Sequence, residues 1–543
     1  MGSPSPLQNA PLLDPVKASS ISYRLDGMPP ADRAAAVAAA GILIAAACAA
    51  GLNTAAVLHP SAIPPLFLAI VLIAAGYAAV DYEMTAGAFR AMTRGIAITG
   101  GLFVLVHPPS YDVSETASPA MWHAFFAIGY YAAVAGAVLA LARPLFILVP
   151  ASYLQLHTVA SNVITSAYSS DLDYIPVAQA GVFLAAGLMT TLALARLPAL
   201  RRDRATLVPT ASGLLAAAAI GLHFANYFHS GIAKLSLDGG VTSWLLENDV
   251  GNRYLAALDN GVLPFAGWPE FTAWLYEQLH AHHLAGNFAV VAVQLAVLLA
   301  VASPRGILVF SLAADLLHVG IYLTSGANFW PWFGLNLTTA CAAAHFRAQG
   351  FTAAHRAIAM AMVALAPPFF YVAKLAWYDT PANNRIRFVA ELDDGQLQDL
   401  PFAYFRSKSY PVAYMSLGTP LGHYPTTTLA GTQFAAVARE AKQCSERLRA
   451  LHGPREHPIE DVDTFVRRHH RYVLGNPAPN PLALGGLLDH FASHGASRTM
   501  LPADPRRIVA YRYIVESICL GYSDGKFTRR IDHVSERRID VGR

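Results

Sequence analysis

Charged residues are scarce in this sequence. Asp, Glu, Lys and Arg make up 13% of the 543 residues, whereas 55% are hydrophobic. An average soluble domain carries about 25% charged residues, so this composition argues against a purely soluble protein. The mean hydropathy of +0.38 points the same way. The net charge is only +3 and no basic run suggests a nucleic-acid partner, which excludes that class of function.

Cysteine is also rare. Cys48 and Cys341 lie in apolar runs, where small buried thiols are common, and no CxxC pair or zinc-site spacing occurs. Cys444 and Cys519 share a C-terminal segment of soluble composition. They can form a disulfide there if the compartment is oxidising and their Cα atoms lie within about 7 Å. The histidine run at 280–283 is more typical of a solvated interface than of a metal centre, and we predict no metal site.

The N-terminus lacks the pattern of a secretory signal. Residues 1–33 are rich in proline and serine, and no basic stretch is followed directly by a short apolar core. We therefore predict no cleaved signal peptide and interpret residues 1–33 as an N-terminal tail, whose cytoplasmic location is predicted from the arginine pattern below. The first apolar run begins at about residue 34 and is long enough to span a membrane.

Long apolar runs are the most abundant feature of the sequence. A run of about 17–25 apolar residues is typical of a helix that spans a bilayer. Eleven such runs predict an all-α polytopic membrane bundle over residues 34–378. Their approximate bounds are 34–57, 63–81, 92–107, 119–142, 144–166, 174–196, 207–233, 284–302, 305–324, 328–346 and 354–377.

Arginines occur in every second loop of this bundle, for example Arg143 and Arg305, while the loops between them carry few basic residues. Cytoplasmic loops are enriched in Lys and Arg, so the pattern predicts a cytoplasmic N-terminus. Eleven spans then place the region after the last span outside the cytoplasm. We expect a multi-pass protein of the inner (plasma) membrane, with Lys234 at the outer face.

Two polar regions lie on the predicted outer side. Residues 234–283 are too polar to span, and their tryptophans favour short interfacial helices with aromatic anchors. Residues 379–543 predict a small extracytoplasmic α+β domain, here called the outer domain. Strands are expected at 385–392 and 512–521, each followed by an Asp-Gly turn signal, and the two strands are expected to pair. Helical spacing predicts helices over 434–451 and 461–473.

A polar stripe ends the seventh apolar run. His223, Asn226, Tyr227, Ser230 and Lys234 recur at offsets that place them on one helical face. Polar side chains within a membrane are costly unless they face the bundle interior or a wet cavity, so the stripe is a candidate site. Lys234 has two interpretations. It is either a snorkelling lysine at a helix end or a general base.

Other polar and aromatic residues of the predicted spans widen the candidate site. His229 lies on a different face from His223, towards a neighbouring helix. Asp315 and His318 sit one turn apart in the ninth span, where they either tie helices together or relay protons. Trp330 and Trp332 open the tenth span, as belt anchors or as the walls of a pocket for a flat ring.

Two motifs resemble a known family. The run from Tyr227 to Leu235, Tyr-Phe-His-Ser-Gly-Ile-Ala-Lys-Leu, is followed by Trp244. A second motif runs from His318-Val-Gly-Ile to Asn-Phe-Trp-Pro-Trp, which ends at Trp332. Both resemble motifs of the HTTM family, the transmembrane domain of vitamin K-dependent gamma-glutamyl carboxylases and their bacterial relatives. The similarity covers about residues 85–345, and Ala233 stands where the carboxylases have a second lysine.

The resemblance implies a chemistry for the stripe. In the carboxylases the motif lysine is the base that deprotonates reduced vitamin K, and Lys234 matches it. The cofactor would be reduced vitamin K or another isoprenoid quinol. The partners would be membrane lipids and a peptide or protein substrate, with no nucleic acid. We assign catalytic roles to Lys234 and to the residues that support it, which are His223, Tyr227 and Ser230. Cofactor binding is assigned to Asn226, His229, His318, Trp330 and Trp332.

Two functions stay open at this point. The first is a quinol-dependent membrane enzyme, a carboxylase-like lyase or an oxidoreductase, that uses a lysine base. The second is a non-catalytic membrane protein that binds a lipid or a protein partner through its outer domain. A transporter ranks third, because the sequence shows no sign of inverted repeats or paired broken helices. The two leading functions differ in whether the stripe lines an enclosed pocket or faces lipid.

Overall fold

The structure is a computed structural model of the full chain. The residues that it describes are 28–165, 174–408, 412, 420–427, 429, 431–451, 459–476, 488, 490, 491 and 504–542. The predicted tail over residues 1–33 lies mostly outside this range. Asp171 and Asp173, which precede the sixth predicted span, also lie outside the described residues.

A helical bundle and a sheet domain make up the described chain, as the sequence predicts. Each of the eleven predicted spans contains a helix, but seven helices of the described chain are both long and apolar enough to cross a membrane. They are α2 (Pro30–Leu58), α4 (Gly87–Val106), α5 (Pro119–Ala140), α7 (Ile175–Leu194), α9 (Arg204–Leu235), α13 with α14 (His283–Leu295, Val297–Ala300) and α15 (Pro304–Ser325). These helices are compatible with a membrane-embedded protein.

The other predicted spans are shorter or more polar. These helices are α3 (Ile63–Gly76), α6 (Leu148–Thr165), α16 (Trp330–Gln349) and α17 (Ala353–Leu365). The last predicted span, 354–377, with an expected kink at Pro367 and Pro368, is helical only in its first part. Pro367 and Pro368 cannot continue a helix, so α17 ends at Leu365 and residues 371–377 lack helical structure.

Helix α9 lies at the centre of the bundle, where it contacts α2, α7, α13 and α17. Its residues are buried around almost the whole circumference. Small residues allow the closest helix approaches, as is common between membrane helices. A Cβ added at Gly221 of α9 would meet the Ala359 carbonyl of α17 at 2.3 Å. The polar stripe is therefore carried by a helix that is packed on all sides by other helices of the bundle.

The outer domain contains a four-stranded antiparallel sheet in the order β3-β2-β5-β6. The expected pairing of the first and last predicted strands is confirmed, because β2 pairs with β5. The strands are β2 (Ala382–Leu392), β3 (Leu397–Leu400), β5 (Ile508–Ser523) and β6 (Lys526–Asp540). Helices α19 (Ala435–Lys442) and α20 (Ile459–Gly475) occupy the two predicted helical regions. A short pair, β1 (Tyr378–Asp379) and β4 (Gly431–Thr432), joins the domain to the bundle.

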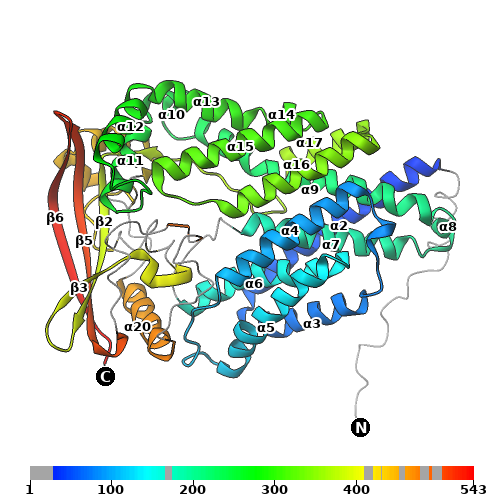
Figure 1. Ribbon diagram of the computed structural model, residues 1–543, viewed down its shortest axis with the longest axis horizontal. Helices are drawn as coiled ribbons and strands as arrows, with labels where there is room; N and C mark the ends of the chain where they lie inside the picture. Colours follow the sequence, from blue (N-terminus) through cyan, green and yellow to red (C-terminus); the bar gives the residue numbers. More distant parts are fainter. Residues whose placement is uncertain are drawn as a thin grey trace, which may run out of the picture.

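The sheet lies at one end of the bundle, together with three short helices (Figure 1). These are α10 (Ser243–Glu247), α11 (Val250–Asp259) and α12 (Pro269–Ala281), which form the expected short helices of residues 234–283. Helix α8 (Pro198–Arg201), which precedes α9, lies at the opposite end (Figure 1). The last turn of α9, with Lys234, therefore points towards the outer domain.

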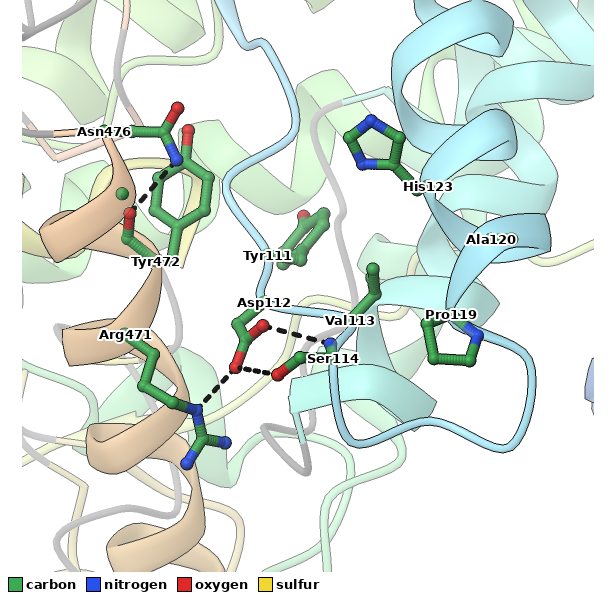
Figure 2. A pocket seen from close by; sticks show the side chains of 11 residues that line it. Tyr111, Asp112, Val113, Ser114, Pro119, Ala120, His123, Arg471, Tyr472 and Asn476 are labelled. Carbon is green, nitrogen blue, oxygen red and sulfur yellow. Dashed lines mark hydrogen bonds and ion pairs between the residues drawn. The ribbon is translucent and has the colours of Figure 1, made fainter.

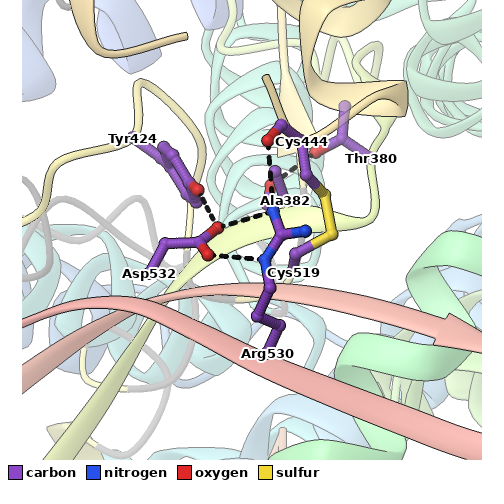
Figure 3. Close-up of a disulfide and its surroundings, with 7 residues drawn as sticks. All are labelled: Thr380, Ala382, Tyr424, Cys444, Cys519, Arg530 and Asp532. Carbon is purple, nitrogen blue, oxygen red and sulfur yellow. Dashed lines mark hydrogen bonds and ion pairs between the residues drawn. A yellow bond between two sulfur atoms is a disulfide. The ribbon is translucent and has the colours of Figure 1, made fainter. Parts of the chain in front are cut away.

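A disulfide joins Cys444 to Cys519, as the sequence suggested, with their Cα atoms 6.0 Å apart (Figure 3). It ties the end of α19 to β5. Arg530 of β6 donates from Nη2 to the Cys444 carbonyl (3.2 Å) and pairs with Asp532. The disulfide therefore fixes the helical part of the outer domain to its sheet.

Candidate functional site

Helix α9 carries the predicted polar stripe through the bundle. His223, Asn226, Tyr227, Ser230 and Lys234 are each at most 7% exposed. Buried polar groups are costly unless they find hydrogen-bond partners. Asn226, Ser230 and Lys234 find their partners in segment 371–377, and we call them the first half of the stripe. His223 and Tyr227, the second half, find theirs in helices α15 and α16.

The first half of the stripe binds the extended segment 371–377. Asn226 Oδ1 accepts a hydrogen bond from the Ala373 N–H (2.9 Å). The Ser230 hydroxyl donates to the Ala373 carbonyl and accepts from the Leu375 N–H, both at 3.1 Å. Non-helical backbone at membrane depth is tolerated where protein groups satisfy it. Asn226 and Ser230 thus satisfy backbone groups of Ala373 and Leu375, which lie outside any helix.

Lys234 completes this half. Its Nζ donates to the Leu375 carbonyl (2.5 Å) and, at 3.5 Å, to the Ser230 carbonyl. The ring of Trp244 in α10 lies 5.3 Å from Nζ, a cation–π distance. Among the described residues, no carboxylate lies within ion-pair distance of Lys234. The side chain is enclosed, so the alternative of a snorkelling lysine in water is wrong.

A small buried polar cluster lies next to Lys234 on the side of the outer domain. Trp244 Nε1 donates to the Trp377 carbonyl (2.8 Å), and Trp377 Nε1 donates to Asp379 Oδ1 (2.9 Å). Asn248 Nδ2 donates to Asp379 Oδ2 (3.2 Å). Burial raises the pKa of Asp379 from 3.8 to about 6, although the charge of Arg253 and these hydrogen bonds act to lower it.

The raised pKa of Asp379 predicts a pH-dependent stability. The folded protein binds this proton more tightly than the unfolded chain, so stability is greatest below about pH 4 and falls as the pH rises towards 6. The contribution is at most about 3 kcal/mol. We expect the Asp379→Asn variant to lack this part of the slope. Thermal unfolding in detergent between pH 4 and 7 measures it as the difference between wild type and variant, and equal slopes would contradict the assignment.

The second half of the stripe joins three helices. His223 Nε2 donates to Asn336 Oδ1 of α16 (2.8 Å), and the Tyr227 hydroxyl is hydrogen-bonded to His318 Nε2 of α15 (2.9 Å). Asn336 Nδ2 donates to the Tyr227 hydroxyl (3.0 Å) and to Asp315 Oδ1 (2.8 Å). Asp315 and His318 are therefore linked through Asn336 and Tyr227, which ties α9, α15 and α16 together.

This cluster retains unused hydrogen-bonding capacity. The Nδ1 atoms of His223 and His318 are buried and have no hydrogen-bond partner among the residues that the structure describes. The Trp332 ring lies 5.8 Å from the His223 ring and 5.5 Å from the His318 ring. The cluster is separate from Lys234, because Lys234 lies eleven positions after His223, which is about 16 Å along the helix. We expected His223 and Tyr227 to support Lys234, but their side chains bond to α15 and α16 instead.

Two of the predicted cofactor-binding residues lie elsewhere. His229 is half-buried, and its Nε2 donates to the Val363 carbonyl of α17 (3.0 Å). Trp330 stacks on Phe103 with a centroid distance of 5.8 Å, and its Nε1 donates to the Leu488 carbonyl (3.0 Å). Among the described residues, no group of three or more His, Cys, Asp or Glu side chains could hold a metal ion.

A cleft of about 500 Å³ lies between the bundle and the outer domain (Figure 2). Its walls come from the loop before α5, the start of α5 and the end of α20. Arg471 donates to Asp112 (2.5 Å) across it, and Tyr111 and Tyr472 supply aromatic surface. The exposed imidazole of His123 lies on the opposite wall (Figure 2). None of the residues that line this cleft belongs to the α9 stripe, so the two are distinct.

Sequence reasoning missed two polar residues beside the stripe, Asn336 and Asp379. The side chain of Asn336 is hydrogen-bonded to both Tyr227 and His223. The sequence feature that could have revealed it is a polar asparagine inside an apolar run. Asp379 was taken only as the start of the outer domain. Its burial depends on Asn248 and Trp377, which no periodicity connects to it.

Comparisons with known proteins give this site no external assignment. The chain matches no protein-family model, no curated protein and no solved structure.

Proposed function

We propose that the chain is an integral membrane enzyme that uses a reduced isoprenoid quinone, with Lys234 as its general base. The observation that carries the proposal is the burial of Lys234, at 7% exposure, with no carboxylate within ion-pair distance among the described residues. A charged group in this setting is expensive, and such residues in membrane helices are functional candidates by default. The resemblance of the Tyr227–Leu235 motif to the HTTM carboxylases supplies the reaction class.

The residues around Lys234 suit a phenolic head group. The Trp244 indole offers a flat apolar face beside the amine, and an aromatic ring can stack on it. When bound, a reduced quinone supplies an acidic hydroxyl and the electrons for reaction with oxygen. Lys234 would take the hydroxyl proton once the hydroxyl replaces the Leu375 carbonyl as the partner of Nζ. Asn226 and Ser230 then hold segment 371–377 as the wall of the site.

The test is direct turnover by the purified protein. Reduced vitamin K, menaquinol and ubiquinol are supplied in aerated lipid nanodiscs, and quinol oxidation is followed by ultraviolet absorbance. Radiolabelled bicarbonate with a glutamate-containing peptide reports carboxylation as acid-stable label. We expect oxidation of at least one quinol above the rate of empty nanodiscs. Background rates with all three quinols would contradict the proposal.

A second candidate is a non-catalytic membrane protein that binds a peptide or protein partner at its outer face. The cleft beside α20 favours it, because about 500 Å³ bordered by Tyr111 and Tyr472 is large enough for several side chains of a partner. In this case Asn226, Ser230 and Lys234 serve only to hold the extended segment. If the purified protein binds a peptide but oxidises none of the quinols, the result would favour this second candidate.

The proposed orientation has the N-terminus in the cytoplasm and the outer domain outside it, in the inner (plasma) membrane. It rests on the arginines in every second loop. We expect an alkaline phosphatase fused after Arg543 to be active, because this enzyme folds only where its disulfides can form. An inactive fusion, together with fluorescence from a cytoplasmic reporter at the same site, would reverse the orientation.

A further inference from the structure

A cavity beside the end of α9 indicates a second binding site. It has a volume of about 330 Å³ and lies where the last turns of α9, segment 371–377 and Gln433 meet. Its apolar walls and two of its polar groups are Ile232, Ala233, Leu237, Ala376, Lys374 and Gln433. Lys234 does not line it, so it is separate from the proposed quinol site.

The cavity lies at the depth of lipid head groups. The 32 residues of α9 span about 48 Å, whereas the hydrocarbon core of a bilayer is about 30 Å thick. The last turns of α9 therefore reach the interface on the side of the outer domain. Tyr371 and Phe434, close to the lining residues in sequence, are 41% and 61% exposed. Exposed aromatic side chains are typical of this interface.

The charge of the cavity selects the kind of ligand. Lys374 is exposed and makes no ion pair or hydrogen bond with any residue that the structure describes, and the same holds for the Gln433 side chain. An unpaired ammonium group at a membrane interface attracts lipid phosphate by about 1 kcal/mol. A neutral quinol head group would form no ion pair with Lys374. The positive charge of Lys374 therefore favours an anionic lipid as the ligand.

We propose that this cavity binds the head group of an anionic phospholipid from the leaflet next to the outer domain. Lys374 contacts the phosphate, and the Gln433 amide donates to it. Ile232, Ala233, Leu237 and the backbone of segment 371–377 surround the glycerol and the first acyl carbons. The bound lipid bridges α9, the extended segment and the start of α19. This inference does not depend on the proposed enzymatic function.

Native mass spectrometry of the purified full-length protein tests the proposal. The protein is titrated in detergent with phosphatidylglycerol and with phosphatidylcholine of the same acyl chains. We expect the wild type to retain one phosphatidylglycerol with about fivefold preference over phosphatidylcholine. Lys374→Ala should abolish the preference and Lys374→Arg should keep it. Ala233→Trp fills the cavity and should lower retention although Lys374 is present.

The controls separate this site from general attraction of anionic lipid. Arg305 is an exposed cation at the start of α15, at the other end of the bundle, and Arg305→Ala should leave the preference unchanged. Inorganic phosphate at the lipid concentration should not displace the lipid, because it lacks the apolar part that the walls bind. An unchanged preference in Lys374→Ala, unchanged retention in Ala233→Trp, or displacement by phosphate would each overturn the proposal.

Discussion

Replacing Lys234 by arginine is expected to reduce quinol oxidation to the background rate. Guanidinium keeps its proton in proteins, so arginine cannot act as the base even though it retains the charge. Lys234→Met should be equally inactive, because methionine fills nearly the same volume without an amine. Since both variants lose the same chemical group in different ways, a common loss of activity points to the amine itself. Initial rates in nanodiscs measure the effect.

Stability must be followed in the same variants, because Lys234 also bonds to the Leu375 carbonyl. Ser230→Ala is the matched control. It removes two hydrogen bonds to segment 371–377 and leaves the amine in place. Hydrogen bonds in membrane proteins average about 0.6 kcal/mol, so this variant should unfold at a slightly lower temperature. Because Ser230 helps to hold the wall of the site, its activity should be reduced but not abolished, unlike that of the Lys234 variants. An active Lys234→Arg or Lys234→Met enzyme would show that Lys234 only holds the extended segment.

Most helices of the bundle were predictable, because long apolar runs are typical of helices that can cross a membrane. The end of the last predicted span was not, since residues 354–377 are apolar on both sides of Pro367 and Pro368. Apolar composition indicates that a segment is buried, but it does not show whether the segment is helical. The backbone partners of segment 371–377 are Asn226 and Ser230, which lie 143 to 147 residues earlier in the chain. Such long-range partners leave no local periodicity.

The sheet was half-predictable for a related reason. The buried strands β2 and β5 carry the expected β-branched and aromatic residues, and both were found. Strand β6 was missed because its sequence, KFTRRIDHVSERRID, resembles an exposed charged loop. Its charges are used by ion pairs across the sheet, as between Arg512 and Glu536 (3.2 Å). Hydrogen bonding to β5 along its whole length, rather than an apolar face, makes this segment a strand.

The candidate site shows the same limit. Helical spacing correctly groups the five polar residues on α9, since this information is local. It cannot show that Asn226, Ser230 and Lys234 bind backbone while His223 and Tyr227 bind the side chain of Asn336. Whether a polar residue has a structural role or is available for chemistry depends on its hydrogen-bond partner. For the stripe, these partners lie in α16 and in segment 371–377, and no local sequence pattern predicts that either of them contacts α9.

Removal of the disulfide is expected to have the largest effect on stability. Cys444 and Cys519 are 75 residues apart, and closing a loop of this length stabilises a fold by about 4 kcal/mol in the chain-entropy account. The Cys444→Ala/Cys519→Ala variant should therefore unfold about 10 °C lower than the wild type, given the size of the outer domain.

The structure offers a matched control for this experiment. Cys48 and Cys341 are free thiols on α2 and α16, so the Cys48→Ala/Cys341→Ala variant should keep the wild-type unfolding temperature. Reductant should lower the unfolding temperature of this control and of the wild type by the same amount, and should not affect the variant without Cys444 and Cys519. Because α19 and β5 would then be joined only by noncovalent contacts, proteolysis between residues 444 and 519 should accelerate as well. An unfolding temperature that is insensitive to reductant in the wild type would mean that the bond contributes nothing to the outer domain.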